Sequence, residues 1–480
     1  MVKRGQIITL DIEDFAFGGK GIARLETENG KYVLFVQNAF PGQKVLAQVK
    51  KKLKKHAECK LVKVLERSPK EVSSPFQEIS GAPYIHVPVD VQEAYKKEVT
   101  LEVYKRIGGL ENVDELFDEF IPSPTHYHYR NKMEYSFSCI EHDIEKDEEL
   151  DDVFALGFKH RGTWWKVESL NKASGLFDEK WENFLHEFRV FLENTGLPAW
   201  HPPKKEGFFR HLVVRKSFYE DRLLINLVTS SQGVEQFDLE AAGNFLKEKC
   251  GDRIAGFQHT INDNVADRAK IENGQCTLAF GKDHVIEELN GLFFEISMES
   301  FFQTNPESAV KLYNKAMEYV FEGERNLEGK VVMDLFCGTG TIGQLLAKRT
   351  NDIEIIGVDI VKEAIEDAKR NAKRNKVKDI QFFAADVGKF LLEFPDFKGK
   401  IDTIVLDPPR AGITPKTLRK VVRLNAQRIV YISCNPATQA RDIQTLNEFG
   451  YITKKLSLLD QFPHTSHIEA IGLFEKEDEI

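Results

Sequence analysis

The most constraining feature of the sequence is a regular alternation of short apolar segments and amphipathic segments that begins near residue 291. Segments such as IEIIGVDI and IDTIVLD are apolar enough to be buried on both faces, and VKEAIEDAKRNAKRN has the periodicity of a helix. This alternation predicts an α/β fold with a Rossmann-like, doubly wound parallel sheet, in which ligands bind at the carboxyl ends of the strands. We therefore expect the functional residues of this part to follow strands.

The first 66 residues have a different pattern. Short β-rich segments are separated by turn signals such as FGGKG and PGQ, which predicts a small OB-like β-barrel. The net charge of the chain is −9, yet residues 1–70 contain 15 lysines and arginines against 7 acidic residues. The run Lys51, Lys52, Lys54 and Lys55 is therefore a candidate RNA contact. The alternative is an edge strand that lysines protect from aggregation.

Residues 67–290 are less regular. They begin with a stretch rich in proline and serine, continue with a segment that predicts a helix over 90–107, and include strand-like segments such as YRNKMEYSFSC and RLLINLVTS. We expect a central α+β domain here, between a barrel over 1–66 and the Rossmann-like domain over 291–480. The acidic segment 141–152 predicts the tip of a solvated hairpin.

The composition indicates a cytoplasmic protein without a membrane segment. No apolar run approaches the roughly 18 residues of a membrane span. The basic residues near the start are not followed by the apolar run of a secretory signal. The six cysteines form no CxxC pair, so neither a disulfide scaffold nor a metal site is expected from their spacing.

The segment DLFCGTGTIG follows an expected strand and opens an expected helix. Its glycines, Gly338 and Gly340 among them, let the backbone approach a ligand closely, and the helix N-terminus contributes positive potential. Asp359 ends the next strand, where a carboxylate would accept hydrogen bonds from both hydroxyls of a ribose. These features by themselves fit NAD and S-adenosylmethionine equally well.

Two further strand ends favour S-adenosylmethionine. Asp386 closes IQFFAAD, where it would hold an adenine amino group. Asp407 closes IDTIVLD and leads into DPPRAG, whose proline pair fixes a rigid turn. A dinucleotide site gains little from carboxylates near its phosphates, whereas a positively charged sulfonium tolerates them well.

The following strand, RIVYISC, places Cys434 at the same edge of the sheet. A cysteine in such a position is often a small buried apolar residue. It also fits a specific chemistry, because C5 of uracil is a poor nucleophile until a thiolate adds to C6. A base must then remove the C5 proton. Glu469, which enters the last strand, is our candidate, and His464 and His467 in the same segment are the alternatives.

Several motifs together resemble those of RNA uracil-C5 methyltransferases of the TrmA/RumA type, which carry an N-terminal TRAM domain. The resemblance covers nearly the whole chain and rests on YRNKMEYSFS, SFFQTNP, DLFCGTGTIG, LDPPRAG, YISCNPATQARD and FPHTSHIE. It implies that Cys434 is the nucleophile and Glu469 the general base. The cofactor-binding positions that it implies are Gln303, Phe336, Thr341, Asp359 and Asp407.

Two more residues in these motifs have competing interpretations. By resemblance Phe301 would stack on the base that is flipped out of the RNA, and the alternative is a phenylalanine of the core. Cys337 lies inside the glycine motif and is expected to pack rather than react.

The chain departs from many bacterial relatives in one respect. Those relatives hold a [4Fe–4S] cluster with four cysteines, whereas the matching positions here are Ser74, Ser80 and Pro83, and no cysteine lies near Leu170. Without thiolates no iron–sulfur cluster is expected, and no other metal site is expected either. The departure leaves open whether the central domain contacts RNA.

We therefore expect a monomeric enzyme that transfers a methyl group from S-adenosylmethionine to C5 of a uridine in structured RNA. Ribosomal RNA, 23S in particular, is the first choice because the TRAM-bearing relatives mostly act there, and transfer RNA is the second. An amino-group methyltransferase or a non-catalytic RNA-binding protein would need neither Cys434 nor Glu469, so this pair favours the uracil chemistry.

Overall fold

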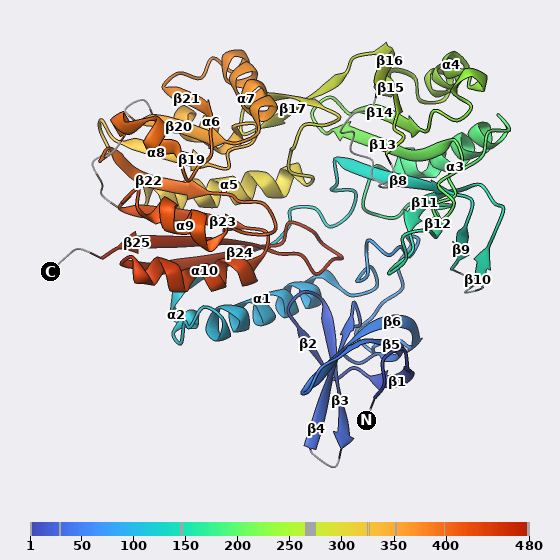
Figure 1. Ribbon diagram of the computed structural model, residues 1–480, viewed down its shortest axis with the longest axis horizontal. Coiled ribbons are helices and arrows are strands. Elements are labelled where there is room, and N and C mark those ends of the chain that lie inside the picture. The colour runs from blue at the N-terminus through green and yellow to red at the C-terminus, as the bar shows by residue number, and fades with distance from the viewer. Residues whose placement is uncertain are drawn as a thin grey trace. The chain divides into compact units, whose positions relative to one another are not determined.

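The structure is a computed structural model that describes residues 2–27, 30–144, 146, 148–264, 275–323, 325, 327–350, 353–397 and 399–477. The chain forms two compact units (Figure 1). The first contains Met1–Ser73, His86–His126 and Glu307–Ile480, and the second contains Ser74–Ile85 and Tyr127–Pro306. The three domains expected from the sequence stay a proposal, because residues 86–126 of the expected central domain pack in the first unit.

The N-terminal part of the first unit is a six-stranded barrel with the strand order β1-β5-β6-β4-β3-β2. Only Ile12 and Glu13 separate β1 from β2, although these strands lie at opposite ends of the order, so the sheet curls on itself. The Ile12 amide donates to the Gln43 carbonyl and the Glu13 amide to the Ile22 carbonyl. The expected β domain is confirmed. Its strands are β1 (Ile7–Asp11), β2 (Asp14–Ala16), β3 (Lys20–Thr27), β4 (Gly30–Gln37), β5 (Lys44–Lys52) and β6 (His56–Glu66).

A long helix, α1 (Val89–Arg106), follows the barrel and corresponds to the helix expected over 90–107. Its Tyr95 ring lies 5.7 Å from the ring of Phe15 and 5.3 Å from the ring of Phe40, measured between centroids. A short helix, α2 (Val113–Leu116), leads from α1 into strand β7 (Phe117–Ile121).

The larger part of the first unit is the expected doubly wound sheet. It has eight strands in the order β21-β20-β19-β22-β23-β25-β24-β7, and the first five run parallel. Strand β25 runs antiparallel to both of its neighbours. The strands are β19 (Val331–Leu335), β20 (Glu354–Asp359), β21 (Ile380–Ala384), β22 (Ile401–Leu406), β23 (Arg428–Ser433), β24 (Tyr451–Leu459) and β25 (Glu469–Lys476).

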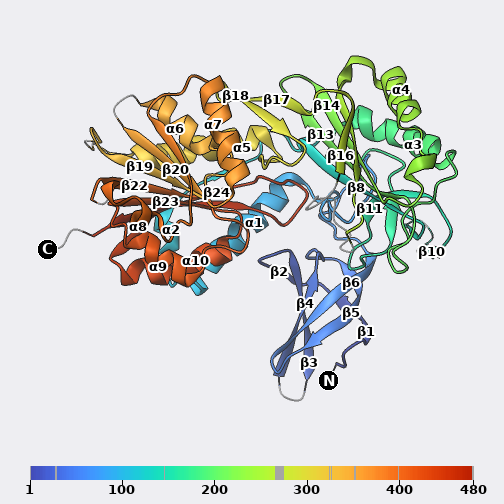
Figure 2. The same ribbon diagram turned by 45° about the horizontal axis from the view of Figure 1, so that its top comes forward.

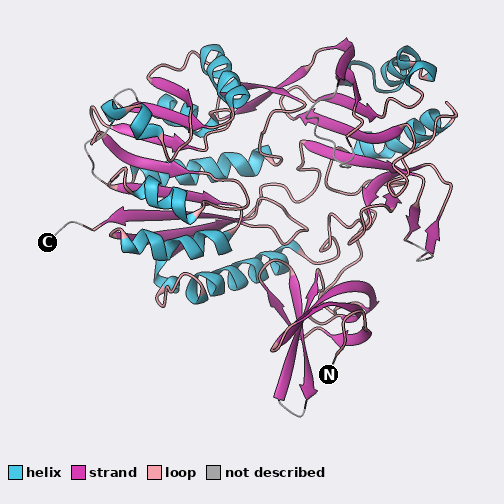
Figure 3. Cartoon of the chain, in the orientation of Figure 1, coloured by secondary structure: helices cyan, strands magenta, loops and turns pink. Residues whose placement is uncertain are grey.

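Helices cover both faces of this sheet (Figures 1, 2 and 3). One face packs against α7 through Ile365, Ala368 and Phe382. The other forms a larger core in which side chains of β19, β22 and β23 meet those of α1, α9 and α10. The helices are α5 (Pro306–Phe321), α6 (Thr341–Arg349), α7 (Lys362–Arg374), α8 (Phe390–Glu393), α9 (Pro415–Val422) and α10 (Pro436–Glu448).

The second unit is built on a nine-stranded sheet with the order β10-β9-β12-β11-β8-β13-β14-β15-β16, and a separate hairpin pairs β17 with β18. Two helices, α3 (Glu179–Glu193) and α4 (Leu239–Cys250), belong to this unit. Strands β9 and β10 pair within the expected acidic hairpin, of which residues 145 and 147 lie outside the described residues. The strands are β8 (Lys132–Ser138), β9 (Glu141–Asp143), β10 (Glu148–Leu150), β11 (Ala155–Lys159), β12 (Val167–Ser169), β13 (Phe209–Ser217), β14 (Arg222–Thr229), β15 (Ile254–Ile261), β16 (Gln275–Gly281), β17 (His284–Leu289) and β18 (Leu292–Ser297).

Within the described residues, no helix combines the length and the hydropathy that a membrane crossing requires. In the same residues, no group of three or more histidine, cysteine, aspartate and glutamate side chains is arranged to hold a metal ion.

Candidate active site

Three of the expected site residues meet at one edge of the eight-stranded sheet. Asp407 follows β22 directly and Cys434 follows β23. Strand β25 runs in the opposite direction, so it begins at this edge with Glu469. The register pairs Ser433 with Ala470, which sets Cys434 and Glu469 at the same end of two neighbouring strands.

The Cys434 thiol lies in an environment that disfavours its thiolate. Burial raises the pKa of this thiol to about 11, and the negative charges of Glu469 and Asp407 raise it further, while Arg410 acts in the opposite direction. The free site therefore holds a thiol at neutral pH. Its conversion to a nucleophile requires a change in these surroundings.

Glu469 is a buried carboxyl, with 4% of its surface exposed. Across the part of the chain that the structure describes, no hydrogen bond or ion pair holds this carboxyl. Burial raises its pKa well above the usual value, Asp407 adds to the effect, and Arg410 opposes it. An unpartnered buried carboxyl costs stability, and such groups concentrate at functional sites.

The glycine loop between β19 and α6 has the backbone that the motif predicts. Phe336, Gly338 and Gly340 all have positive φ angles, of 63°, 52° and 74°. A Cβ atom at Gly340 would lie 2.5 Å from the Phe382 ring, so only glycine fits there. Thr341 is the first residue of α6. The loop thus turns tightly into the N-terminus of α6, and the Gly340 amide donates to the Cys337 carbonyl at 2.8 Å.

Asp359 closes β20 and also organises this loop. One oxygen of its carboxylate accepts the Gly338 amide at 2.9 Å, and the other accepts the Val361 amide at 2.9 Å. The neighbouring Ile360 is 71% exposed, which leaves an apolar side chain beside the carboxylate. Asp386 follows β21 and is exposed. These features fit the ribose and the flat base of an adenosine.

Asp334 in β19 is a further candidate residue that the sequence analysis did not identify. One of its carboxyl oxygens accepts the Gly343 amide at 2.8 Å, whereas the other is buried and has no hydrogen-bond partner among the described residues. Burial raises the pKa of this carboxyl to about 8. An ammonium group of a ligand would donate to this oxygen, and a sulfonium nearby would supply positive charge, so these residues fit S-adenosylmethionine. An aspartate inside an apolar strand was the available signal.

Phe301 and Gln303 lie in the second unit, on the segment after β18. Phe301 is 69% exposed, so it is not a core residue. Buried Arg215 donates to the Ser300 carbonyl at 2.8 Å, and the Asn131 amide group donates to the Gln303 carbonyl at 3.0 Å. These two buried polar residues hold the backbone on both sides of Phe301. The sequence analysis did not identify either of them.

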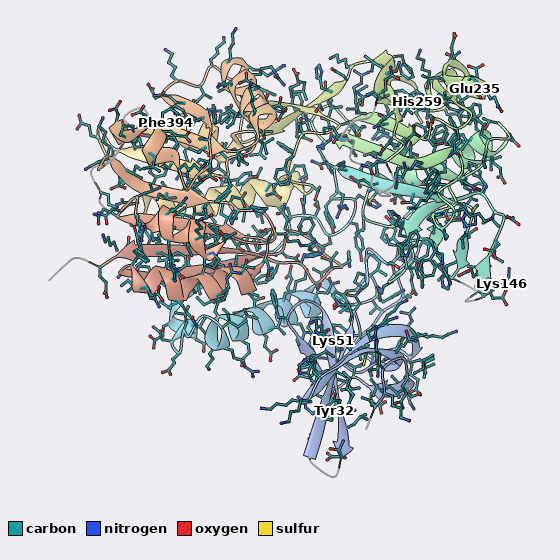
Figure 4. All side chains as sticks on the ribbon, viewed as in Figure 1. Tyr32, Lys51, Lys146, Glu235, His259 and Phe394 are labelled. Carbon is teal, nitrogen blue, oxygen red and sulfur yellow. The ribbon has the colours of Figure 1, made fainter. Side chains whose placement is uncertain are left out.

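The four candidate lysines gather at the tip of one barrel hairpin. Lys51 and Lys52 end β5, and Lys54 and Lys55 lie in the turn to β6. All four are exposed. The Tyr32 hydroxyl donates to the Leu53 carbonyl at 2.8 Å and so fixes the turn (Tyr32 and Lys51 are labelled in Figure 4). Strand β1 pairs with β5 only over Lys44 to Gln48, whereas Lys51 and Lys52 pair with β6, so the alternative of an edge protected by lysines stays open.

The two histidines considered as alternative bases differ in their surroundings. His464 is fully buried, and its backbone amide donates to the Gln92 side chain at 2.7 Å. The His467 ring contacts the guanidinium of Arg410 at 2.6 Å.

The positions that hold cluster cysteines in relatives have other roles here. The Ser80 hydroxyl contacts both carboxylate oxygens of Glu168, at 3.2 Å and 3.3 Å, and accepts the Arg161 amide at 2.8 Å.

Cys337, in the glycine motif, packs against the apolar cluster between α7 and β21, and burial raises the pKa of its thiol well above the usual value.

Comparison with known proteins agrees with this geometry. Residues 258–477 match the family model of tRNA (Uracil-5-)-methyltransferase, and residues 2–62 match that of the TRAM domain. An RNA methyltransferase of Caldanaerobacter subterraneus is 38% identical, with 98% of this chain and 99% of the relative covered. One of Clostridium tetani is 35% identical over the full length of both chains.

A solved structure is also similar over nearly the whole chain. The tRNA (uracil-54, C5)-methyltransferase of Pyrococcus abyssi, in complex with S-adenosyl-L-homocysteine, aligns with a TM-score of 0.68 and 27% identity, and the match covers 97% of this chain and 100% of that one. The two family models match both ends of the chain, and these relatives are similar to it over nearly its whole length. The chain is an S-adenosylmethionine-dependent enzyme that acts on RNA, and it belongs to the RNA uracil-C5 methyltransferase family.

Proposed function

We propose that this enzyme methylates C5 of a uridine through a covalent bond between Cys434 and C6 of the base. The observation that carries the proposal is the pairing of a half-buried thiol with a buried carboxyl that has no hydrogen bond among the described residues, at one end of neighbouring strands. An amino-group methyltransferase has no use for this pair.

The two residues act at opposite ends of the reaction. The Cys434 thiolate forms a bond to C6, and the electrons of the C5–C6 double bond move toward O4, which makes C5 nucleophilic. S-adenosylmethionine, when bound, supplies the electrophilic methyl group. Glu469, which must be ionised at this stage, then takes the proton from C5, the double bond forms again, and the Cys434 thiolate leaves.

The cofactor would be held by residues at the same sheet edge. Asp359 would accept the ribose hydroxyls, and Gly338 and Gly340, which have no side chains, would let the ligand approach the backbone beside the N-terminus of α6. Asp407 and Asp334 supply carboxylates toward positive charge. In the free protein, burial raises the pKa of Asp407 to about 7, so a bound cation would favour its ionised form.

For the RNA we propose two candidates in order. A uridine of 23S ribosomal RNA is the first, as the resemblance to TRAM-bearing relatives implies. A transfer RNA uridine is the second, and the full-length similarity to a tRNA (uracil-54, C5)-methyltransferase favours it. The exposed lysines of the β5–β6 turn and exposed Phe301 support contact with a structured RNA whose target base is flipped out.

Nucleoside analysis of RNA from a strain that lacks this protein tests the proposal. We expect 5-methyluridine to disappear from one position of one RNA, and purified protein with S-adenosylmethionine should restore it in an unmodified transcript of that RNA. Loss of a methylated amino group instead would contradict the uracil chemistry. Loss from transfer RNA alone would replace the first substrate candidate by the second.

A further inference from the structure

The general base proposed above is placed by its backbone rather than by its side chain. Glu469 is the first residue of β25, and its backbone pairs with Leu459 at the end of β24. The segment 460–468 joins these two residues. Because no hydrogen bond or ion pair holds the carboxyl within the described chain, the conformation of this segment determines where the carboxyl lies.

Two buried polar side chains of helix α1 form hydrogen bonds with this segment. The Gln92 side-chain carbonyl accepts the His464 backbone amide at 2.7 Å, and its nitrogen lies 3.1 Å from Nδ1 of His464. The Lys96 ammonium donates to the Asp460 carboxylate at 2.8 Å and to the Phe462 carbonyl at 3.1 Å. Gln92 is 2% exposed and Lys96 is 3% exposed.

Hydrogen bonds inside the segment connect these contacts to residues closer to Glu469. The Thr465 hydroxyl donates to the Phe462 carbonyl at 2.8 Å and accepts the His467 amide at 3.1 Å. A continuous series of hydrogen bonds therefore runs from Lys96 to a residue two positions before Glu469. Buried ion pairs add little net stability compared with apolar packing, but removing one partner is costly, so such pairs can specify a single arrangement.

We propose that Gln92 and Lys96 are positioning residues for the general base. They act through segment 460–468 and contact neither substrate nor cofactor in this account. The proposal rests on the proposed function, because it requires that Glu469 removes the C5 proton. Loss of either side chain should slow proton removal selectively, so the methylated RNA should remain attached to Cys434 for longer.

The test measures how much methyl-labelled RNA stays bound to the protein after denaturation. It compares the full-length wild type with Glu469→Gln, Gln92→Ala and Lys96→Met. The matched control is Glu102→Gln, because Glu102 lies on the same helix in an ion pair with Arg106, and Arg106 has 77% of its side chain exposed. Affinity for S-adenosylmethionine and the melting temperature are measured for every variant. Lys96→Arg, which keeps a cation for Asp460, is the conservative variant.

We expect Gln92→Ala and Lys96→Met to accumulate at least about tenfold more adduct than the wild type, since displacing a reacting group by about 1 Å can cost about 100-fold in rate. Cofactor affinity should stay within about twofold, and Lys96→Arg and Glu102→Gln should behave like the wild type. Wild-type adduct levels in folded Gln92→Ala, with accumulation in Glu469→Gln, would overturn the positioning role alone. Absence of adduct in Glu469→Gln would overturn the base itself. If Lys96→Met does not fold, the adduct level of Gln92→Ala decides whether the positioning role holds.

Discussion

Cys434 illustrates how a single residue can be well placed and still unreactive. Burial raises the pKa of its thiol to about 11, and two carboxyls nearby oppose its ionisation. Only a small fraction is thiolate at neutral pH, and below the pKa this fraction rises about tenfold with each pH unit. The thiol is thus protected from oxidation and non-specific addition until the site changes. Arg410 is the neighbouring charge that acts in favour of the thiolate.

The first prediction concerns the pH dependence of adduct formation in Glu469→Gln, which isolates the thiol step. Its rate should rise about tenfold per unit between about pH 7 and about pH 9, because the thiolate is the reacting form. Arg410→Gln should lower this rate at every pH in the range. Rapid-quench measurement of protein-bound RNA gives the rate, and a rate independent of pH would contradict ionisation of Cys434 as the controlling step.

At this scale the sequence predicts which residues end strands but not their surroundings. Asp359, Asp407, Cys434 and Glu469 lie where the motifs place them, because strand ends are local features. His464, the alternative base, is buried and its backbone amide donates to Gln92, which is far away in the chain, so no local pattern could show these surroundings. Asp334 was missed for a similar reason, since its environment is set by neighbouring strands.

At the scale of the elements, strand β19 contains Asp334, a proposed cofactor contact, and the burial of this carboxyl costs stability. Asp334 is fully buried between strands, and its pKa of about 8 lies far above the value of a solvated aspartate. A raised pKa in the folded state means that folding favours the protonated form. This contribution is complete below about pH 4 and is lost as the pH rises through about 8.

The second prediction follows from this linkage. Asp334→Asn keeps an oxygen to accept the Gly343 amide and removes the ionisation. Without cofactor, the variant and the wild type should have similar melting temperatures near about pH 5, and the variant should be the more stable of the two near about pH 9. Calorimetry at both pH values checks this. If the melting temperatures of the variant and the wild type differed by the same amount at both pH values, a raised pKa of Asp334 would be contradicted.

The order of elements could be predicted only in part. The alternation of strands and helices indicated β19 to β23, and the helix expected over 361–375 corresponds to α7. Strand β7 could not be expected as the outermost strand of this sheet, because residues 127–306 of the second unit lie between it and the other strands in the chain, and it pairs with β24. Such long-range pairing leaves no periodic signal in a short window.

At the scale of the whole molecule, the net charge of the barrel differs in sign from that of the rest of the chain. The barrel presents exposed lysines at its β5–β6 turn, whereas the remainder of the chain is acidic. Attraction of RNA should therefore be local to the barrel rather than spread over the surface. The same helix that contacts the barrel through Tyr95 also holds the segment before Glu469.

The third prediction tests this division of charge. Replacing Lys51, Lys54 and Lys55 by glutamine should weaken RNA binding and reduce the dependence of affinity on salt by about 0.7 to 0.9 in slope for each phosphate contact that is lost. S-adenosylmethionine affinity should not change. The control replaces exposed Lys362, Lys373 and Lys378, which lie on or beside α7. Equal salt slopes for both triple variants would contradict an RNA role of the barrel lysines.

The most direct test of the account is to locate the covalent bond in the trapped intermediate. Glu469→Gln incubated with S-adenosylmethionine and the substrate RNA should give a denaturation-resistant adduct, because Cys434 still adds but the C5 proton stays. Nuclease and protease digestion followed by mass spectrometry should then find a methylated uridine on the peptide that contains Cys434. The double variant Cys434→Ala/Glu469→Gln should give no adduct. A methylated uridine on another residue, or free turnover of Glu469→Gln without adduct, would contradict the proposed mechanism.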